Sequence, residues 1–184
     1  MTEIAERYRT VASGFTAVAA LVPEPAWDDP SPCEGWVARD VIRHMVEWIP
    51  SFINSATAIT VSVEPSVDSD PVAAWQALSD SLQRLLDDPR TAASEFVHEY
   101  AGRHTLEAAI AMFILHDVLI HTWDLARATG QDVVLDAEEV QLMLVGIEPM
   151  DEILRSSGHF GPRVEISETA SDQDRLLAFV GRRP

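Results

Sequence analysis

The sequence predicts an all-α protein built on a bundle of four main helices. Apolar residues recur every three or four positions over four long stretches, which is helical spacing. Proline, glycine or a capping residue bounds most of these stretches, and alternating, strand-like runs are few and short. The four stretches are residues 2–21, 37–60, 71–88 and 105–129. No repeat or long linker divides the chain. We therefore expect one domain over residues 1–184, with residues 156–184 as a C-terminal tail packed on the bundle.

Composition limits the function classes. The formal net charge is −17, and the 13 basic residues are scattered arginines, so a nucleic-acid partner is not expected. The absence of lysine excludes Schiff-base chemistry. The single cysteine, Cys33, excludes an internal disulfide and a multi-thiolate zinc site.

The sequence also favours a cytoplasmic protein without a membrane partner. Hydrophobic residues make up 47% of the chain, an ordinary content for a globular protein, and we find no run of about 18 apolar residues. The N-terminus is acidic and lacks the apolar region of a signal peptide.

The first two helices have clear boundaries. Thr2 is a candidate N-cap of helix 2–21, and Pro23 and Pro25 follow its end. The expected buried positions of this helix are Ile4, Tyr8, Val11, Phe15, Val18 and Val22. After an irregular loop, helix 37–60 has apolar positions at Val37, Val41, Met45, Trp48, Ile49, Phe52 and Ile53.

The middle of the chain holds a third helix and a crossing segment. Asp70 is a suitable N-cap for helix 71–88, and Pro71 suits its first position. Residues 90–104 predict a short extended segment or hairpin across the bundle, with His98 and His104 at the surface. Helix 105–129 follows, and Gly130 supplies its stop.

The C-terminal third is expected to hold shorter elements. Asp136 caps a helix that runs to about Arg155, and Pro149 should kink or break it. A loop over residues 156–162, a short strand over 163–166 and a last helix over about 171–180 complete the chain.

The candidate site begins with Asp117 and His121. These residues are four positions apart on or beside the apolar stripe of helix 105–129, so their side chains point the same way. A carboxylate and an imidazole facing an interior must be satisfied, and a divalent metal would satisfy both. A buried Asp–His hydrogen bond without a metal gives the same pattern.

A third ligand would distinguish these two readings. His44 lies on the edge of the apolar face of helix 37–60, one turn from Val41 and from Trp48. A lone histidine at such a position is also typical of a core-edge side chain bonded to a backbone carbonyl. Glu47 is an alternative ligand, or else a solvated residue that pairs with Arg43.

Three stretches together resemble a known family. They run from Pro32 to His44 (PCEGWVARDVIRH), from Asp117 to Gly130 (DVLIHTWDLARATG) and from Asp174 to Pro184 (DRLLAFVGRRP). The chain thereby resembles the actinobacterial metal-binding proteins of the DinB-like superfamily, in particular the metal-binding domains of mycothiol-dependent maleylpyruvate isomerases.

This resemblance implies an up-and-down four-helix bundle with one divalent metal held by His44, Asp117 and His121. The isomerase has glutamate where this chain has Asp117, which leaves metal affinity and identity open. The isomerase also has a second, C-terminal domain that contributes to its active site, so we do not transfer its specific activity. The resemblance implies a metal site that activates a low-molecular-weight thiol, with mycothiol as the expected co-substrate.

Three protein ligands leave open positions, which is typical of a catalytic metal. Two histidines and a carboxylate suit Zn²⁺, Ni²⁺, Fe²⁺ or Co²⁺, of which we expect Zn²⁺ or Ni²⁺. Asp124, three residues after His121, would orient that imidazole from the second shell or else pair at the surface with Arg127.

Four further side chains near these motifs have less certain roles. Trp48 and Trp123 would wall the pocket or pack in the core. His116 points roughly 140° away from His121 and is expected on another face. Cys33 is expected to be a free, partly buried thiol rather than a ligand.

Three functions are compatible with these features. The first is a metal- and thiol-dependent transferase or isomerase acting on a small electrophile, with catalytic residues unknown. The second is a non-catalytic metal- or small-ligand-binding stress-response protein. The third is a structural helical dimer with a buried Asp–His bond. Helix bundles of this size often pair along one face, so a homodimer is compatible with all three.

Overall fold

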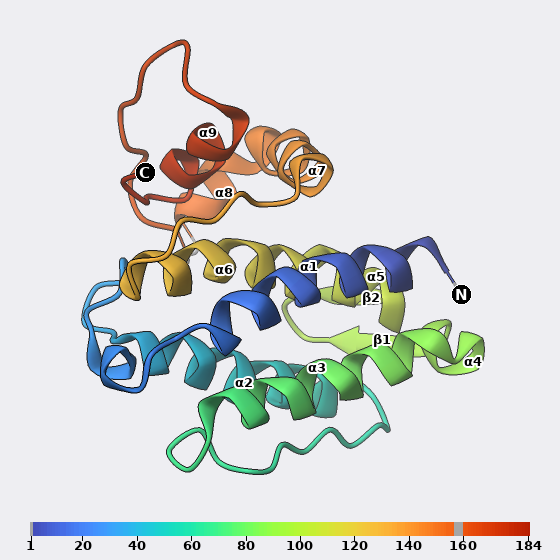
Figure 1. Ribbon diagram of the computed structural model, residues 1–184. Coiled ribbons are helices and arrows are strands. Elements are labelled where there is room, and N and C mark those ends of the chain that lie inside the picture. Colours follow the sequence, from blue (N-terminus) through green and yellow to red (C-terminus); the bar gives the residue numbers. More distant parts are fainter. Residues whose placement is uncertain (1, 157–159) are drawn as a thin grey trace. The chain divides into compact units, whose positions relative to one another are not determined.

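The computed structural model describes residues 2–156 and 160–184. The chain forms two compact units, Met1–Gln131 and Asp132–Pro184, and each is treated by itself (Figure 1). The second unit begins well before the expected C-terminal tail at residue 156. The packing of that tail on the bundle stays a prediction.

The first unit is helical, with one small hairpin. Its elements in chain order are α1 (Glu3–Ala20), η1 (Glu24–Asp28), α2 (Ala38–Ala56), α3 (Pro71–Asp87), α4 (Pro89–Ala92), β1 (Glu95–His98), β2 (Gly102–Thr105), α5 (Leu106–Ala109), η2 (Ile110–Leu115) and α6 (His116–Ala128). The all-α prediction and its four main helices are confirmed.

The four long helices form a ring in which α1 and α2 each pack against α3 and α6. In Figure 1, α2 and α3 run in the same direction, and residues 57–70 bring the chain back along the bundle between them. Successive long helices therefore do not alternate in direction between α2 and α3. The return segment is tied to the bundle by the buried side chains of Val61 and Val67.

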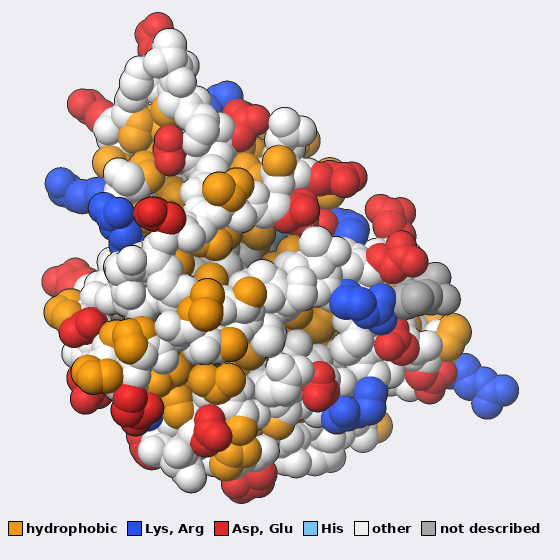
Figure 2. All heavy atoms as spheres, viewed as in Figure 1, with side chains coloured by type: hydrophobic (Ala, Val, Ile, Leu, Met, Phe, Trp, Pro, Cys, Tyr) orange, Lys and Arg blue, Asp and Glu red, His pale blue; other side chains and the backbone are white. Residues whose placement is uncertain are grey.

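The core consists of apolar stripes from these helices. On α2 the fully buried stripe is Val41, Met45, Ile49 and Ile53. Burial of each such side chain contributes about 1.5–3 kcal/mol, so this face of α2 alone is a major stabilising element. Figure 2 shows acidic side chains scattered mainly around the edges of the face drawn, with hydrophobic and uncharged groups over much of its centre.

The helix boundaries follow the capping residues. Thr2 accepts a hydrogen bond from the backbone of Ala5, and Asp70 accepts one from Ala73, as predicted. Helix α2 ends at Ala56, four residues earlier than predicted. The amide of Asn54 bonds to both backbone groups of Val61, which draws the chain out of helical geometry.

The segment before the last long helix is the hairpin that the sequence suggested. Strands β1 and β2 pair antiparallel, with Phe96 opposite His104. Gly102 has φ +83°, a conformation that favours glycine at this turn. His98 and His104 are half-buried rather than fully at the surface, because their rings contact phenylalanines.

The helix from Leu106 to Ala128 is continuous, but its middle, η2, is π-helical. It is long and apolar enough by length and composition to cross a membrane, and 61% of its most apolar window is buried inside the protein. Such burial is typical of a core helix. The sequence does not predict this π-helical segment, because apolar spacing alone does not distinguish it from an α-helix.

The second unit contains α7 (Ala137–Ile147), η3 (Glu148–Met150), α8 (Asp151–Ser156) and α9 (Asp172–Phe179). The predicted break at Pro149 is confirmed, since this residue lies in η3 between α7 and α8. The predicted strand at 163–166 is wrong: these residues have no regular structure, and Val164 donates a backbone hydrogen bond to Ala178.

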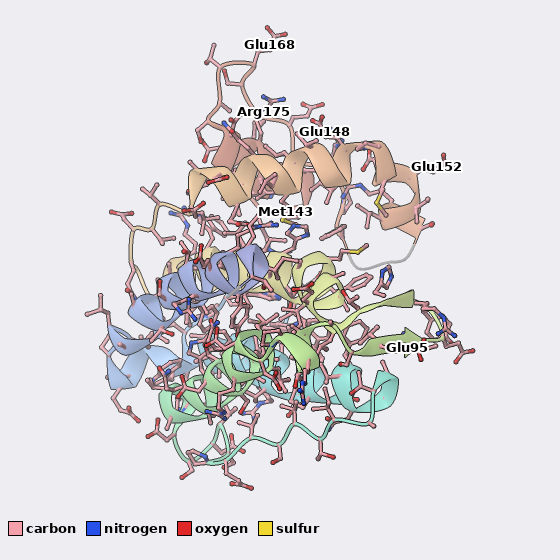
Figure 3. All side chains as sticks on the ribbon, turned by 90° about the vertical axis from the view of Figure 1, so that its right-hand side faces the viewer. Glu95, Met143, Glu148, Glu152, Glu168 and Arg175 are labelled. Atoms are coloured by element: carbon pink, nitrogen blue, oxygen red, sulfur yellow. The ribbon has the colours of Figure 1, made fainter. Side chains whose placement is uncertain are left out.

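Helices α7 and α9 pack together, and Arg175 on α9 lies 3.9 Å from Glu148 (Figure 3). The predicted last helix is confirmed, with buried Leu176, Leu177, Phe179 and Val180. Of the expected loop at 156–162, residues 157–159 lie outside the described part of the chain.

Candidate metal centre

Two helices bring together the three side chains that the sequence singled out. His44 comes from α2, and Asp117 and His121 come from successive turns of α6. Nε2 of His44 lies 3.2 Å from Oδ2 of Asp117, and Nε2 of His121 lies 3.4 Å from Oδ1 of Asp117. One ligand atom from each residue lies within 4.8 Å of the other two.

These spacings fit a small divalent cation. Zinc bonds to nitrogen and oxygen are about 2.0–2.2 Å long, so adjacent ligands of a tetrahedral site lie about 3.3–3.6 Å apart. The 3.2 and 3.4 Å separations, which run to different oxygens of Asp117, lie within a few tenths of an ångström of that value. The donor set, two imidazoles and one carboxylate, suits Zn²⁺, Ni²⁺, Fe²⁺ or Co²⁺.

His121 is oriented by a buried carboxylate. Nδ1 of His121 lies 2.9 Å from Oδ2 of Asp124, and the side chain of Asp124 is 0% exposed. A proton on Nδ1 donates to this oxygen and leaves Nε2 facing Asp117. This is the usual arrangement behind a metal-bound histidine. The alternative of an Asp124 at the helix surface, paired with Arg127, is not observed.

Asp117 is oriented by a tryptophan. Nε1 of Trp48 donates to Oδ2 of Asp117 at 2.9 Å, so Trp48 does more than wall the pocket. Trp123, the other candidate wall, is a buried residue of α6.

Trp36 is a site residue that the sequence analysis did not single out. Its ring lies 5.1 Å from that of His44 and stacks on His121 at 5.9 Å. Trp36 could have been identified as a site residue from its position, because it lies directly before the ligand helix and follows a glycine. That glycine, Gly35, has φ +79° in the structure.

The charges of the cluster reinforce one another. Burial raises the free energy of the charged form of Asp117, but the neighbouring imidazoles of His121 and His44 outweigh this and hold the pKa of the carboxyl well below its usual value. Burial alone would lower the pKa of His121. The charge of Asp117 and hydrogen bonds to Asp117, Asp124 and Cys33 outweigh burial and raise that pKa well above the ordinary value. Without a metal, both pKa shifts favour the ion-paired form of Asp117 and His121.

Cys33 lies beside Asp124, the carboxylate that bonds to Nδ1 of His121. Its Sγ is 3.4 Å from Oδ2 of Asp124, so Cys33, Asp124 and His121 form a second group of possible metal ligands. The first group is the better candidate for an open site. In that group the side chains of His44 and Asp117 are 30% and 25% exposed, whereas Asp124 is fully enclosed.

The other candidates do not belong to the first cluster. Glu47 is exposed, and its suggested partner Arg43 instead pairs with Asp40 and Asp68, at 3.3 and 2.7 Å. His116 belongs to neither group of possible ligands among the described residues, in line with its expected position on another face.

Neither of two cavities among the described residues contains the cluster. One cavity, of about 690 Å³, lies between the end of α2 and the segment from Arg90 to Val97. The other, of about 380 Å³, lies in the second unit beside Arg163 and Arg175. In the metal-ligand cluster, the side chains of His44 and Asp117 are partly exposed, whereas His121 is buried.

This chain is similar to known proteins. Two uncharacterized proteins of Mycobacterium tuberculosis, MT0763 of strain CDC 1551 and Rv0738 of strain H37Rv, are each 28% identical to this chain over 181 residues, which is 95% of both chains. No solved structure matches. The model of the mycothiol maleylpyruvate isomerase N-terminal domain matches residues 8–126, which include all three candidate ligands. The chain therefore belongs to the family of the mycothiol maleylpyruvate isomerase N-terminal domain.

Proposed function

We propose that the first unit binds one divalent metal, Zn²⁺ or Ni²⁺, through His44, Asp117 and His121, and that the protein is a thiol-dependent transferase or isomerase acting on a small electrophile. The observation that carries this proposal is the convergence of two imidazoles and a carboxylate from two helices, with their ligand atoms within 4.8 Å of one another. The family supports a role linked to mycothiol, which we propose as the co-substrate.

The residues of the chain have separate roles in this proposal. Asp124 holds the tautomer of His121, and Trp48 fixes the carboxylate of Asp117. His44 and Asp117 form the exposed side, where a thiol and an electrophile would approach. A metal bound there would lower the pKa of a coordinated thiol and so supply a nucleophile at neutral pH.

The proposed function is a reaction class. The Mycobacterium relatives that match almost the whole chain are themselves uncharacterized, so they name no electrophile. The position equivalent to the isomerase glutamate is Asp117, whose shorter side chain reaches both imidazoles because α2 and α6 pack directly against each other.

The test measures thiol consumption. Full-length protein, loaded with Zn²⁺ or Ni²⁺, is incubated with mycothiol and a panel of small electrophiles, with and without a chelator. We expect consumption of thiol with at least one electrophile, lost on chelation and in the His44→Ala variant, and retained in the His116→Ala variant.

Two results would contradict parts of the proposal. Metal binding without thiol turnover on any electrophile would contradict the enzymatic part and favour a non-catalytic metal-binding protein. Turnover that survives both chelation and His44→Ala would show that the chemistry does not use this centre.

A further inference from the structure

A line of half-buried rings leads away from the three candidate ligands. On α2, the residues His44, Trp48 and Phe52 follow one another every four positions. On the facing helix, His121, Asp117 and Phe113 do the same in the opposite direction. We call the three apolar members, Trp48, Phe52 and Phe113, the aromatic seam.

The seam is continuous with the candidate metal site. Trp48 touches the site through its hydrogen bond to Asp117. Its ring lies 5.4 Å from that of Phe52, which meets Phe113 edge to face at 5.5 Å. Rings therefore extend without interruption from the carboxylate ligand to the π-helical segment η2.

Packing of the bundle does not account for this exposure. The adjacent stripe of α2, from Val41 to Ile53, is fully buried and supplies the core contacts of the helix. All three seam residues keep part of their surface accessible. Accessible aromatic surface beside a polar site is typical of a site that binds a small organic molecule.

The hairpin closes the far end of the seam. The ring of His98 lies 5.0 Å from that of Phe52, and the ring of His104 lies 6.1 Å from that of Phe113. Nδ1 of His98 accepts backbone hydrogen bonds from Tyr100 and Ala101, which fixes this ring in place. Four residues of an α-helix rise about 6 Å, so the spacing of Trp48 and Phe52 along α2 is comparable with the width of a single benzene ring.

We propose that the aromatic seam binds a flat, apolar group of the substrate, of benzene size, while the polar end of the same molecule reaches His44, Asp117 and His121. This inference rests on the proposed metal centre and adds a substrate class to it. Edge-to-face and offset contacts with Trp48, Phe52 and Phe113 add to the binding free energy of a flat ring, beyond the contribution of its burial.

The test compares two chelating probes that differ only in the group beyond the chelate. Acetohydroxamic acid carries a methyl group, and benzohydroxamic acid carries a phenyl ring. Their affinities for the full-length, metal-loaded protein are measured by calorimetry. We expect the phenyl probe to bind about tenfold more tightly, and the preference to fall below about threefold in Phe52→Ala/Phe113→Ala.

Two further variants separate ring recognition from loss of structure. Phe52→Leu keeps most of the apolar volume and should still reduce the preference. Leu21→Ala removes an exposed apolar side chain directly after α1, outside the seam, and should leave the preference unchanged. Thermal unfolding and metal content of each variant report on its fold. If the double variant does not fold, Phe52→Leu decides the question.

The outcomes distinguish this inference from the function on which it rests. Absence of bound metal in the wild-type protein would overturn both, and elemental analysis would show it. If metal and acetohydroxamic acid bind, but wild type shows no phenyl preference or the seam variants retain it, only the aromatic seam is overturned.

Discussion

Asp124 and His121 form a buried hydrogen bond, with Oδ2 of Asp124 2.9 Å from Nδ1 of His121. The two residues are three positions apart on α6, so the helix itself sets their spacing. This bond leaves Nε2 of His121 directed at Asp117 and His44. The orienting carboxylate and the ligand it orients therefore belong to one rigid element.

Removal of that carboxylate should weaken metal binding. We expect Asp124→Ala to lower the affinity for Zn²⁺ or Ni²⁺ by about 10–100-fold, because the imidazole loses its fixed orientation and part of its basicity. Competition with a chromogenic chelator measures this. Arg127→Ala, one turn along the same helix, is the control and should change the affinity less than twofold. Equal losses in the two variants would argue against an orienting role.

The tryptophan bond to Asp117 gives a second prediction. Trp48→Phe keeps a ring in the seam but removes the N–H that donates at 2.9 Å. We expect metal affinity to fall by about threefold to tenfold, because the carboxylate becomes free to rotate. The same competition assay applies, with Trp36→Phe as a variant that keeps a ring near His121. Unchanged affinity in Trp48→Phe would mean that the hydrogen bond does not position the ligand.

Metal binding should release a proton at neutral pH. The pKa of His121 is raised well above its ordinary value, so Nε2 is protonated in the metal-free protein, whereas the lowered pKa of Asp117 keeps its carboxylate ionised. Metal binding at Nε2 must displace that proton. Affinity should therefore rise with pH up to the raised pKa of His121 and fall as the pH is lowered.

Calorimetry in buffers of different ionisation enthalpy counts the protons. We expect release of about one proton from His121 per metal at pH 7. An ordinary imidazole would release only about a quarter of a proton, since most of it is already neutral there. Asp124→Ala should reduce the number, because it removes one cause of the raised pKa. Release of only about a quarter of a proton per metal by the wild-type protein would contradict the description of Asp117 and His121 as an ion pair.

The cap of α3 gives a prediction on stability. Asp70 accepts the backbone hydrogen bond of Ala73 at 2.9 Å, and Asp70→Ala should destabilise the protein by about 1 kcal/mol. Asp80→Ala, within the same helix, removes an exposed carboxylate and should cost less. Urea unfolding of both variants tests this. Equal losses of unfolding free energy in the two variants would show that the capping hydrogen bond of Asp70 does not stabilise the helix.

The sequence was sufficient where one local signal decided the structure. Thr2 and Asp70 mark helix starts by side-chain capping, and Pro149 breaks a helix because it lacks an N–H. It failed where tertiary contacts decide. The segment 163–166 alternates like a strand, but among the described residues no strand lies beside it, and its backbone bonds to the end of α9 instead.

The site was predictable in part for the same reason. Asp117, His121 and Asp124 are related by helical spacing, so their common face follows from the sequence. The contribution of His44 depends on how α2 packs against α6, so its place on the edge of an apolar face made it only one candidate, and the family resemblance then implied it as a ligand. The contacts of Trp48 with Asp117 and of Trp36 with His121 are tertiary contacts that no periodicity predicts.

The most direct test of the account is the metal content of untagged protein, measured by elemental analysis for wild type, His121→Ala and His116→Ala. We expect about one divalent metal per chain in wild type and in His116→Ala, and almost none in His121→Ala, because its imidazole is the ligand shared by all candidate arrangements. Full metal content in His121→Ala, or none in wild type after supply of Zn²⁺ and Ni²⁺, would contradict the account.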